Sequence, residues 1–301
     1  MSHLSITPAL ASGLLVLYTV AYVAPLYASK TTRPSETLNR DHPQVIRGRI
    51  AAVTLSTAAC TIVSYIIISR APEGARSGLD ALALMGCWPL GVSETARILL
   101  LNSLLFAGPI FESLVIEGGW RALVDGVTIG SVWSNLQNRR NLVVGPITEE
   151  ALFRSAAVPL FVIAGVSPVR TIFVTPILFG LAHVHHFYEF RITHPKVPVS
   201  MALIRSFVQF TYTSVFGSMA TFFFLRTQSF LAVALLHAQC NALGLPRFWG
   251  PVNPYWVPYD VPSTSPKVRV WTVAYYVILV LGTAAWYTCL WPLSYSAQGI
   301  Y

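Results

Sequence analysis

The stretch Gly145-Pro-Ile-Thr-Glu-Glu-Ala-Leu-Phe-Arg154 places two adjacent glutamates and an arginine at the start of an apolar run that is otherwise typical of a membrane span. Ionised side chains cost about 2.5–3.5 kcal/mol each at the centre of a membrane helix, so they usually face a partner or a cavity. On a helix, Glu150 and Arg154 share one face, whereas Glu149 points about 100° away from Glu150. We therefore expect Glu150 to pair with Arg154, and Glu149 to face elsewhere without a local partner.

The composition of the whole chain indicates an integral membrane protein. Of its 301 residues, 54% are hydrophobic and only 11% are charged, whereas soluble domains are about 25% charged. Apolar runs of about 20 residues predict eight spans, near residues 9–28, 50–69, 98–116, 146–165, 171–188, 206–225, 228–244 and 270–290. These spans leave no room for a soluble domain, so we expect one all-α transmembrane bundle over residues 1–301, with its functional core at 145–244.

Three segments need separate interpretation. The first apolar run is long enough to span and no Lys or Arg precedes it, so we expect a transmembrane helix rather than a signal peptide. The run from Ala81 to Leu90 is too short to span and is either re-entrant or interfacial. The loop from Val252 to Pro266 is rich in Pro, Tyr and Trp, which excludes a regular helix and suits the membrane–water interface.

The charge distribution predicts how the bundle is oriented. The chain carries a formal net charge of +8, and most of its 20 basic residues fall in loops on one side of the predicted bundle. The positive-inside rule makes that side cytosolic and places both termini on the opposite side. A basic cytosolic face favours anionic lipid head groups, whereas nucleic-acid binding is disfavoured because no binding motif accompanies the charges. The four cysteines are scattered, so neither a disulfide framework nor a zinc knuckle is expected.

Polar side chains are few in the other predicted spans, and they include Glu112, His183, His185, His186, His237, Gln239 and Asn241. With this topology, Glu149 lies about one turn from the cytosolic end of its helix, and His183, His237 and Asn241 lie one to two turns from the same side. These four groups therefore fall in one layer, about 5–10 Å below the cytosolic surface. Chance would scatter them across the bilayer, so we expect a polar site there.

The spacing of these residues favours hydrolysis of a peptide bond. His237 and Asn241 lie four residues apart on one helical face, and both can donate hydrogen bonds to a developing oxyanion. Phe179 lies one turn from His183 and places an aromatic ring beneath the imidazole. A carboxylate and an imidazole can hold and orient one water, which makes Glu149 a candidate general base.

Each residue also has a purely structural interpretation. A lone histidine or asparagine in a membrane helix usually bonds across helices. We expect His185, His186 and Glu112 to be solvated near the cytosolic interface and leave them out of the site. The Glu150–Arg154 pair is expected to be structural and to orient Glu149. A proton-relay transporter would contain a similar cluster.

Three motifs in order carry a more specific signal: Glu149-Glu150-x-x-x-Arg154, Phe179-x-x-x-His183 and His237-x-x-x-Asn241. Together they resemble the signature of the type II CAAX prenyl endopeptidases, the Ras-converting enzymes. These belong to the CAAX-protease and bacteriocin-processing family of intramembrane glutamate-dependent proteases. The motifs fall on three different predicted helices and cover about a third of the chain.

The resemblance implies an enzyme of the endoplasmic reticulum membrane whose site opens to the cytosol. Its substrates would be prenylated Cys-a-a-X proteins such as Ras-type small GTPases, from which it would remove the last three residues. By the same resemblance, Glu149 and His183 would activate water, while His237 and Asn241 would stabilise the oxyanion. Glu150, Arg154 and Phe179 would support them. The expected partners are prenylated protein C-termini and membrane lipid, with no cofactor and no metal.

Other functions remain open at this point. A zinc-dependent membrane protease would use Glu149, His183 and His237 as ligands from separate helices, although His-Glu-x-x-His is absent. A cysteine protease would use Cys240, three residues from His237. A non-catalytic membrane scaffold of the same fold would not need Glu149. A proton-coupled transporter would show a broken-helix pair in matching halves, and none is apparent.

Overall fold

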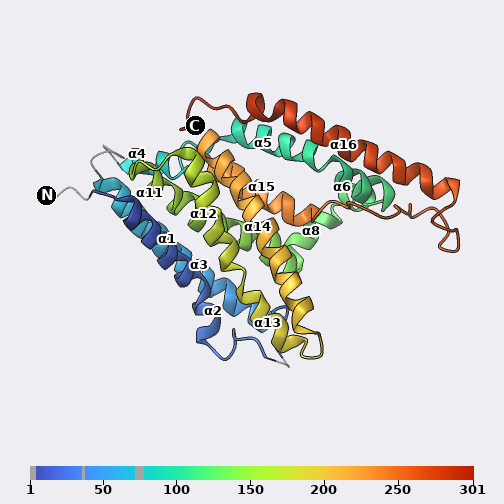
Figure 1. Ribbon diagram of the computed structural model, residues 1–301, viewed down its shortest axis with the longest axis horizontal. Coiled ribbons are helices and arrows are strands. Elements are labelled where there is room, and N and C mark those ends of the chain that lie inside the picture. Colours follow the sequence, from blue (N-terminus) through green and yellow to red (C-terminus); the bar gives the residue numbers. More distant parts are fainter. Residues whose placement is uncertain (1–4, 36–37, 72–77) are drawn as a thin grey trace.

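The computed structural model describes residues 5–35, 38–71 and 78–301, which form helices joined by loops, with no β-strand within these ranges. Figure 1 shows α1 (Pro8–Val23) and α3 (Pro43–Arg70) along one side, and α5 (Val92–Leu105) with α16 (Pro266–Ser294) along the other. Between them run α12 (Pro168–Ala182), α14 (Val199–Thr227) and α15 (Phe230–Leu243). The all-α fold expected from the sequence is confirmed.

Among the described residues, three helices are long and apolar enough to cross a membrane: Pro8–Ala28, which joins α1 to α2 (Pro25–Ala28), Pro43–Arg70 and Pro266–Ser294. A fourth candidate is the pair Val92–Leu105 and Ala107–Ile116, which bends by 81°. That pair comprises α5, α6 (Ala107–Phe111) and the π-helical turn η1 (Glu112–Ile116). The chain is a helical membrane protein, but the eight predicted spans are not confirmed in its described part.

Of the remaining predicted spans, the one near residues 206–225 lies within the long helix α14, and the one near 228–244 is the shorter helix α15. The other two are broken, and the breaks coincide with polar residues. The run near residues 146–165 divides into α10 (Gly145–Glu150), the π-helical turn η3 (Ala151–Ala156) and α11 (Val158–Ile163). The run near 171–188 breaks at His183, between α12 and α13 (His185–Thr193). Single π turns inside helices are often found at functional sites. The shorter elements are α4 (Gly78–Leu84), α7 (Trp120–Val124), α8 (Val127–Ser134), α9 (Leu136–Arg139) and η2 (Arg140–Val144).

Helix boundaries follow simple sequence signals. A serine or threonine followed by proline begins α1 at Thr7-Pro8, α12 at Ser167-Pro168 and α16 at Ser265-Pro266, and each hydroxyl accepts a backbone N–H of the first turn. Proline suits this first position because its missing N–H would have no helical partner. At the other end of α15, Gly244 has φ +67°, a conformation that ends a helix readily.

The two larger apolar clusters of the described residues hold most of the helices together. The first surrounds Leu15, Phe153 and Phe179 and joins α1, α3, the η3–α11 segment and α12. The second surrounds Ile98 and Phe224 and joins α5, α14, α15 and α16. The segment α10–η3 contacts α3 on one side and α15 on the other. Its charged residues are therefore carried into the interior between the two clusters.

The run from Ala81 to Leu90 packs against the beginning of α15. The Gly86 carbonyl accepts a hydrogen bond from the Phe230 N–H at 2.9 Å, and the Ser229 hydroxyl donates to the Leu90 carbonyl at 2.9 Å. Met85 is buried, and its carbonyl accepts from Ser155. The segment is thus a short helix and turn anchored to the bundle, consistent with its being too short to span. The segment from Val252 to the start of α16 contains no helix, as its prolines predict.

Helix α16 lies close to α5 and α6 because Gly282 has no side chain. A Cβ at this position would collide with the Leu104 carbonyl oxygen and would lie 2.7 Å from Ala107 Cβ. We expect Gly282→Ala to reduce the free energy of unfolding by about 1–3 kcal/mol, since the helices must separate. In the matched control Gly13→Ala, the new Cβ meets nothing within 4 Å, so alanine should stabilise by up to about 1 kcal/mol. Denaturant unfolding in detergent measures both, and equal effects would contradict the close packing.

Candidate active site

The carboxylate of Glu149 lies between two imidazoles. Its Oε2 is 3.8 Å from His183 Nε2 and 4.0 Å from His237 Nε2. Both separations exceed a direct hydrogen bond and suit a contact bridged by one water molecule. The Glu149 side chain is 19% exposed, so a reactant can reach it. Helix α10 thus points this glutamate toward the second and third sequence motifs.

The break between α12 and α13 fixes the tautomer of His183. Its Nδ1 lies 2.8 Å from the carbonyl oxygen of Phe179. Because a carbonyl only accepts, Nδ1 carries the proton and Nε2 presents a lone pair on the side facing Glu149. The Phe179 ring packs edge-on against the imidazole at 4.9 Å between centroids, as the spacing predicts. Glu149 and His183 therefore form a pair of acceptors facing one another.

Glu150 has two partners rather than the one expected. Its Oε1 accepts from Arg154 Nη1 at 3.0 Å and from His237 Nδ1 at 2.7 Å. Glu150 and Arg154 are only 0% and 1% exposed, so the predicted pairing exists and is fully buried. The guanidinium also lies 4.4 Å from the centroid of the Phe179 ring, which is a favourable cation–π distance. Glu150 therefore orients His237 as well as neutralising Arg154.

Asn241 lies on the rim of this cluster. It is exposed, one turn beyond His237 on α15, and its Nδ2 donates to the backbone carbonyl of Asn141 at 2.9 Å. A carboxamide nitrogen has two N–H donors, so this contact leaves a second one. The structure thus places Glu149, His183 and His237 together, with Asn241 beyond them toward the end of its helix.

The prediction that Glu112 is simply solvated at the interface is wrong. Its Oε1 accepts from Arg247 Nε at 2.9 Å and Nη2 at 2.6 Å, and its side chain is only 15% exposed. The hydrogen bond raises the pKa of the Arg247 guanidinium. Arg247 follows α15 in the chain, a position that helix spacing cannot relate to Glu112. The pair therefore joins η1 to the loop after α15.

The same prediction is wrong for His185 and His186, which are part of a buried network. His186 Nδ1 lies 2.9 Å from Glu189 Oε2, and Glu189 also forms an ion pair with Arg49 of α3. Glu189 is only 5% exposed. The spacing of His186 and Glu189 on one helical face was an available signal for the first contact, whereas nothing local indicates Arg49.

Three neighbours of the cluster, Tyr22, Thr148 and Phe216, are not indicated by the sequence. Tyr22 reaches from α1 and its hydroxyl lies 3.1 Å from that of Thr148, which precedes Glu149. The Phe216 ring from α14 lies 4.6 Å from that of His237. These contacts join separate helices, so no spacing pattern in the sequence could reveal them.

The neighbouring polar residues of α15 face away from this cluster. Asn102 of α5 donates to Gln239, which in turn donates to Ser103. The Cys240 thiol lies 3.7 Å from Asn102 Oδ1. Gln239 and Cys240 therefore cross-link α15 to α5. The contacts of Cys240 do not support the role of nucleophile.

Comparisons of different parts of the chain with known proteins agree with one another. Residues 131–243 match the family model "Type II CAAX prenyl endopeptidase Rce1-like". The chain is 33% identical to "Probable CAAX prenyl protease 2" of Schizosaccharomyces pombe over 270 residues, which cover 90% of this chain and 89% of that protein. It is 30% identical to human "CAAX prenyl protease 2", with 75% and 68% of the two chains covered. The corresponding identity to the Saccharomyces cerevisiae protein is 28%, with 89% and 91% covered. No solved structure matches the chain.

Breaking the buried ion pair between Glu150 and Arg154 should lower the stability of the fold. Glu150→Gln removes the charge opposite Arg154 and leaves the guanidinium uncompensated in the interior, so we expect a loss of about 3–5 kcal/mol in the free energy of unfolding. The matched control is Asp41→Asn, which removes the partner of Arg140 from a site where the aspartate side chain is 48% exposed. Its cost should be below about 1 kcal/mol. Denaturant unfolding in detergent compares the two, and similar small losses would contradict the importance of the buried pair.

Proposed function

Because the chain belongs to the family of type II CAAX prenyl endopeptidases, we propose that it cleaves prenylated Cys-a-a-X proteins with a water molecule activated between Glu149 and His183. The activity is that of a membrane-embedded CAAX prenyl protease, a hydrolase acting on peptide bonds. The observation that carries the proposed mechanism is the position of the Glu149 carboxylate, 3.8 Å from one imidazole and 4.0 Å from another.

The architecture suits a protein substrate that carries a covalently attached lipid. A prenyl chain partitions into hydrocarbon, and the bond to be cut is attached directly to the prenylated cysteine. On α12, the apolar side chains of Phe173, Ile177 and Leu181 are exposed at four-residue spacing, on the helix that ends at His183. This face supports entry of the lipid from within the bilayer. We infer that the enzyme resides in the endoplasmic reticulum membrane with its site toward the cytosol, where its partners are prenylated C-termini and lipid rather than nucleic acid.

The first chemical step uses the two facing acceptors. A water between Glu149 and His183 donates one hydrogen to the carboxylate and one to His183 Nε2, so its oxygen lone pairs point at the substrate carbonyl. As the water oxygen bonds to the carbonyl carbon, Glu149 takes a proton as general base. When the carbon–nitrogen bond breaks, Glu149 returns this proton to the leaving amine. The products are a free tripeptide and the prenylated protein with a new carboxyl group, which then loses its remaining proton to solvent.

The oxyanion requires hydrogen-bond donors on the opposite side. Asn241 supplies an N–H without any change of protonation. His237 donates its Nδ1 proton to Glu150, so it can donate from Nε2 only as an imidazolium. Glu150 would thus orient the His237 ring, whose Nε2 lies on the side facing Glu149.

A cleavage assay on a farnesylated Cys-a-a-X peptide tests the general base. We expect Glu149→Ala to lower turnover by about 10²–10⁴-fold without loss of folding, and a chelator to leave the wild-type rate unchanged. Glu150→Ala should also be impaired, through misorientation of His237 or reduced stability. Full activity in Glu149→Ala would overturn the mechanism in favour of a non-catalytic role for this cluster, and loss of activity with chelator would favour the zinc-protease alternative.

The oxyanion donors are tested by separating turnover from binding. We expect His237→Ala or Asn241→Ala to reduce kcat by about 10²–10³-fold with little change in KM, because the contacts strengthen only in the transition state. Leu235→Ala is the matched control, since this α15 side chain is 41% exposed on the outer surface and should leave both constants near wild type. A raised KM with normal kcat in the Asn241 variant would show that it binds substrate instead.

A further inference from the structure

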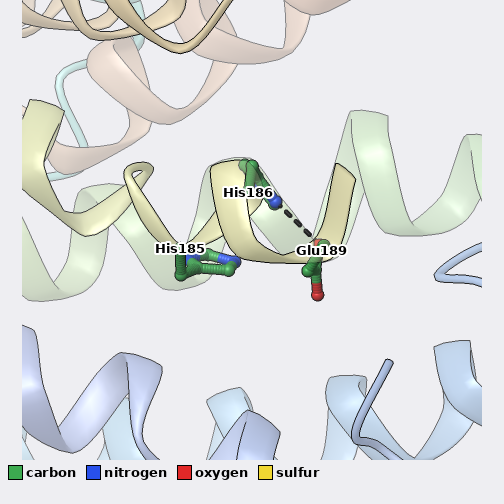
Figure 2. A group of neighbouring side chains, drawn as sticks. All are labelled: His185, His186 and Glu189. Atoms are coloured by element: carbon green, nitrogen blue, oxygen red, sulfur yellow. Dashed lines mark hydrogen bonds and ion pairs between the residues drawn. The ribbon is translucent and has the colours of Figure 1, made fainter. Parts of the chain in front are cut away.

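A second polar cluster lies on α13, apart from Glu149. Figure 2 shows His185, His186 and Glu189 side by side on this helix, with the contact between His186 and Glu189 dashed. One potential ligand atom from each residue lies within 4.8 Å of the other two. We propose that these three side chains form a binding site for a divalent transition-metal ion such as Zn²⁺. The proposal does not depend on the cleavage mechanism above.

His185 has the arrangement of a metal ligand. Its Nδ1 lies 2.7 Å from the Ala182 carbonyl, which only accepts, so Nδ1 is the protonated nitrogen and Nε2 carries a lone pair. That Nε2 atom is buried and has no hydrogen-bond partner among the described residues. Histidines that bind metals almost always donate their other N–H in this way, often to a backbone carbonyl. A metal ion would satisfy the unpartnered nitrogen.

His186 and Glu189 supply the other two ligands. His186 Nδ1 lies 2.9 Å from Glu189 Oε2, and one proton joins the two atoms in a hydrogen bond. A metal ion takes the place of that proton, which passes to solvent, as is usual when metals bind protein ligands. Two histidines and one glutamate are a known ligand set for Zn²⁺ with an open fourth position. Small rotations of the three side chains would bring the ligand atoms to coordination distance.

Arg49 both supports and weakens this site. It forms an ion pair with Glu189 through Oε1, and its Nε and Nη2 also donate to the Thr32 carbonyl at 3.0 and 2.8 Å. The guanidinium therefore fixes the carboxylate and leaves Oε2 facing His186. Its positive charge also repels a cation, so we expect weaker binding than at a structural zinc site of neutral surroundings.

The geometry favours this cluster over the candidate active site as a metal site. Within the described ranges, His185, His186 and Glu189 form the group of three potential metal ligands whose ligand atoms all lie within 4.8 Å of one another. Glu149 approaches His183 and His237 pairwise, but these three do not meet the same condition. The His183 and His186 rings are 6.0 Å apart between centroids, so a metal on α13 would be next to the candidate site without occupying it.

Metal binding to the purified full-length protein in detergent tests the proposal. After treatment with chelator, Co²⁺ is added and its visible absorption is followed, while equilibrium dialysis counts bound Zn²⁺. We expect one equivalent in wild type, and at least about tenfold weaker binding in His185→Ala and in Glu189→Gln. His185→Ala is the decisive variant, because the lost Nε2 has no hydrogen-bond partner in the described part of the chain. The melting temperature of this variant without metal checks folding.

Two controls separate this site from the catalytic proposal. His194→Ala removes an exposed imidazole just after α13 and should bind metal like wild type. Glu149→Ala should also keep the metal while losing cleavage, so either proposal can fail without the other. The metal site is overturned if wild type binds no metal, if His185→Ala binds as wild type does, or if Glu149→Ala alone abolishes binding.

Discussion

The carboxylate of Glu150 joins parts of the chain that are far apart in sequence inside an apolar interior. It binds the guanidinium four residues ahead and an imidazole on α15, and no part of its side chain is exposed. An isolated charge at such a position is very costly, so the two partners must be present for the fold to hold. The orientation of His237 is therefore tied to global stability, and the site around Glu149 is assembled whenever the bundle folds.

The assembly of the candidate site also requires breaks in two of the helices. A regular membrane helix satisfies all its backbone groups internally and directs its side chains outward at fixed angles. The π turn after Glu150 and the break at His183 depart from this regularity at the positions where side chains from three helices converge. The carbonyl of Phe179 then accepts from the imidazole of His183. The breaks thus give backbone groups a role in setting tautomers.

The sequence predicted features that depend on local spacing, and missed those that depend on how helices meet. The Glu150–Arg154 pair and the edge-on contact of Phe179 with His183 follow from helical periodicity. The predicted span near residues 228–244 likewise matches α15, which ends before Gly244. The contact of His237 with Glu150 and the ion pair of Glu189 with Arg49 join residues 87 and 140 positions apart, and nothing in a single sequence relates such positions. The eight spans predicted from hydropathy are not confirmed, since hydropathy detects apolar composition and not the breaks within a run.

The exposure of Asn241 has a consequence for how the reaction ends. The inner half of the candidate site, around Glu150, is sealed by protein, whereas the outer half ends at the exposed amide of Asn241. On the proposed mechanism, the two products differ in solubility: the tripeptide is small and charged, and the shortened protein keeps its lipid. The tripeptide would escape across the open rim and be diluted in water, while the lipidated product would diffuse away within the membrane. Because the products would separate into water and membrane, re-formation of the peptide bond would be negligible, and no conformational change would be needed to prevent it.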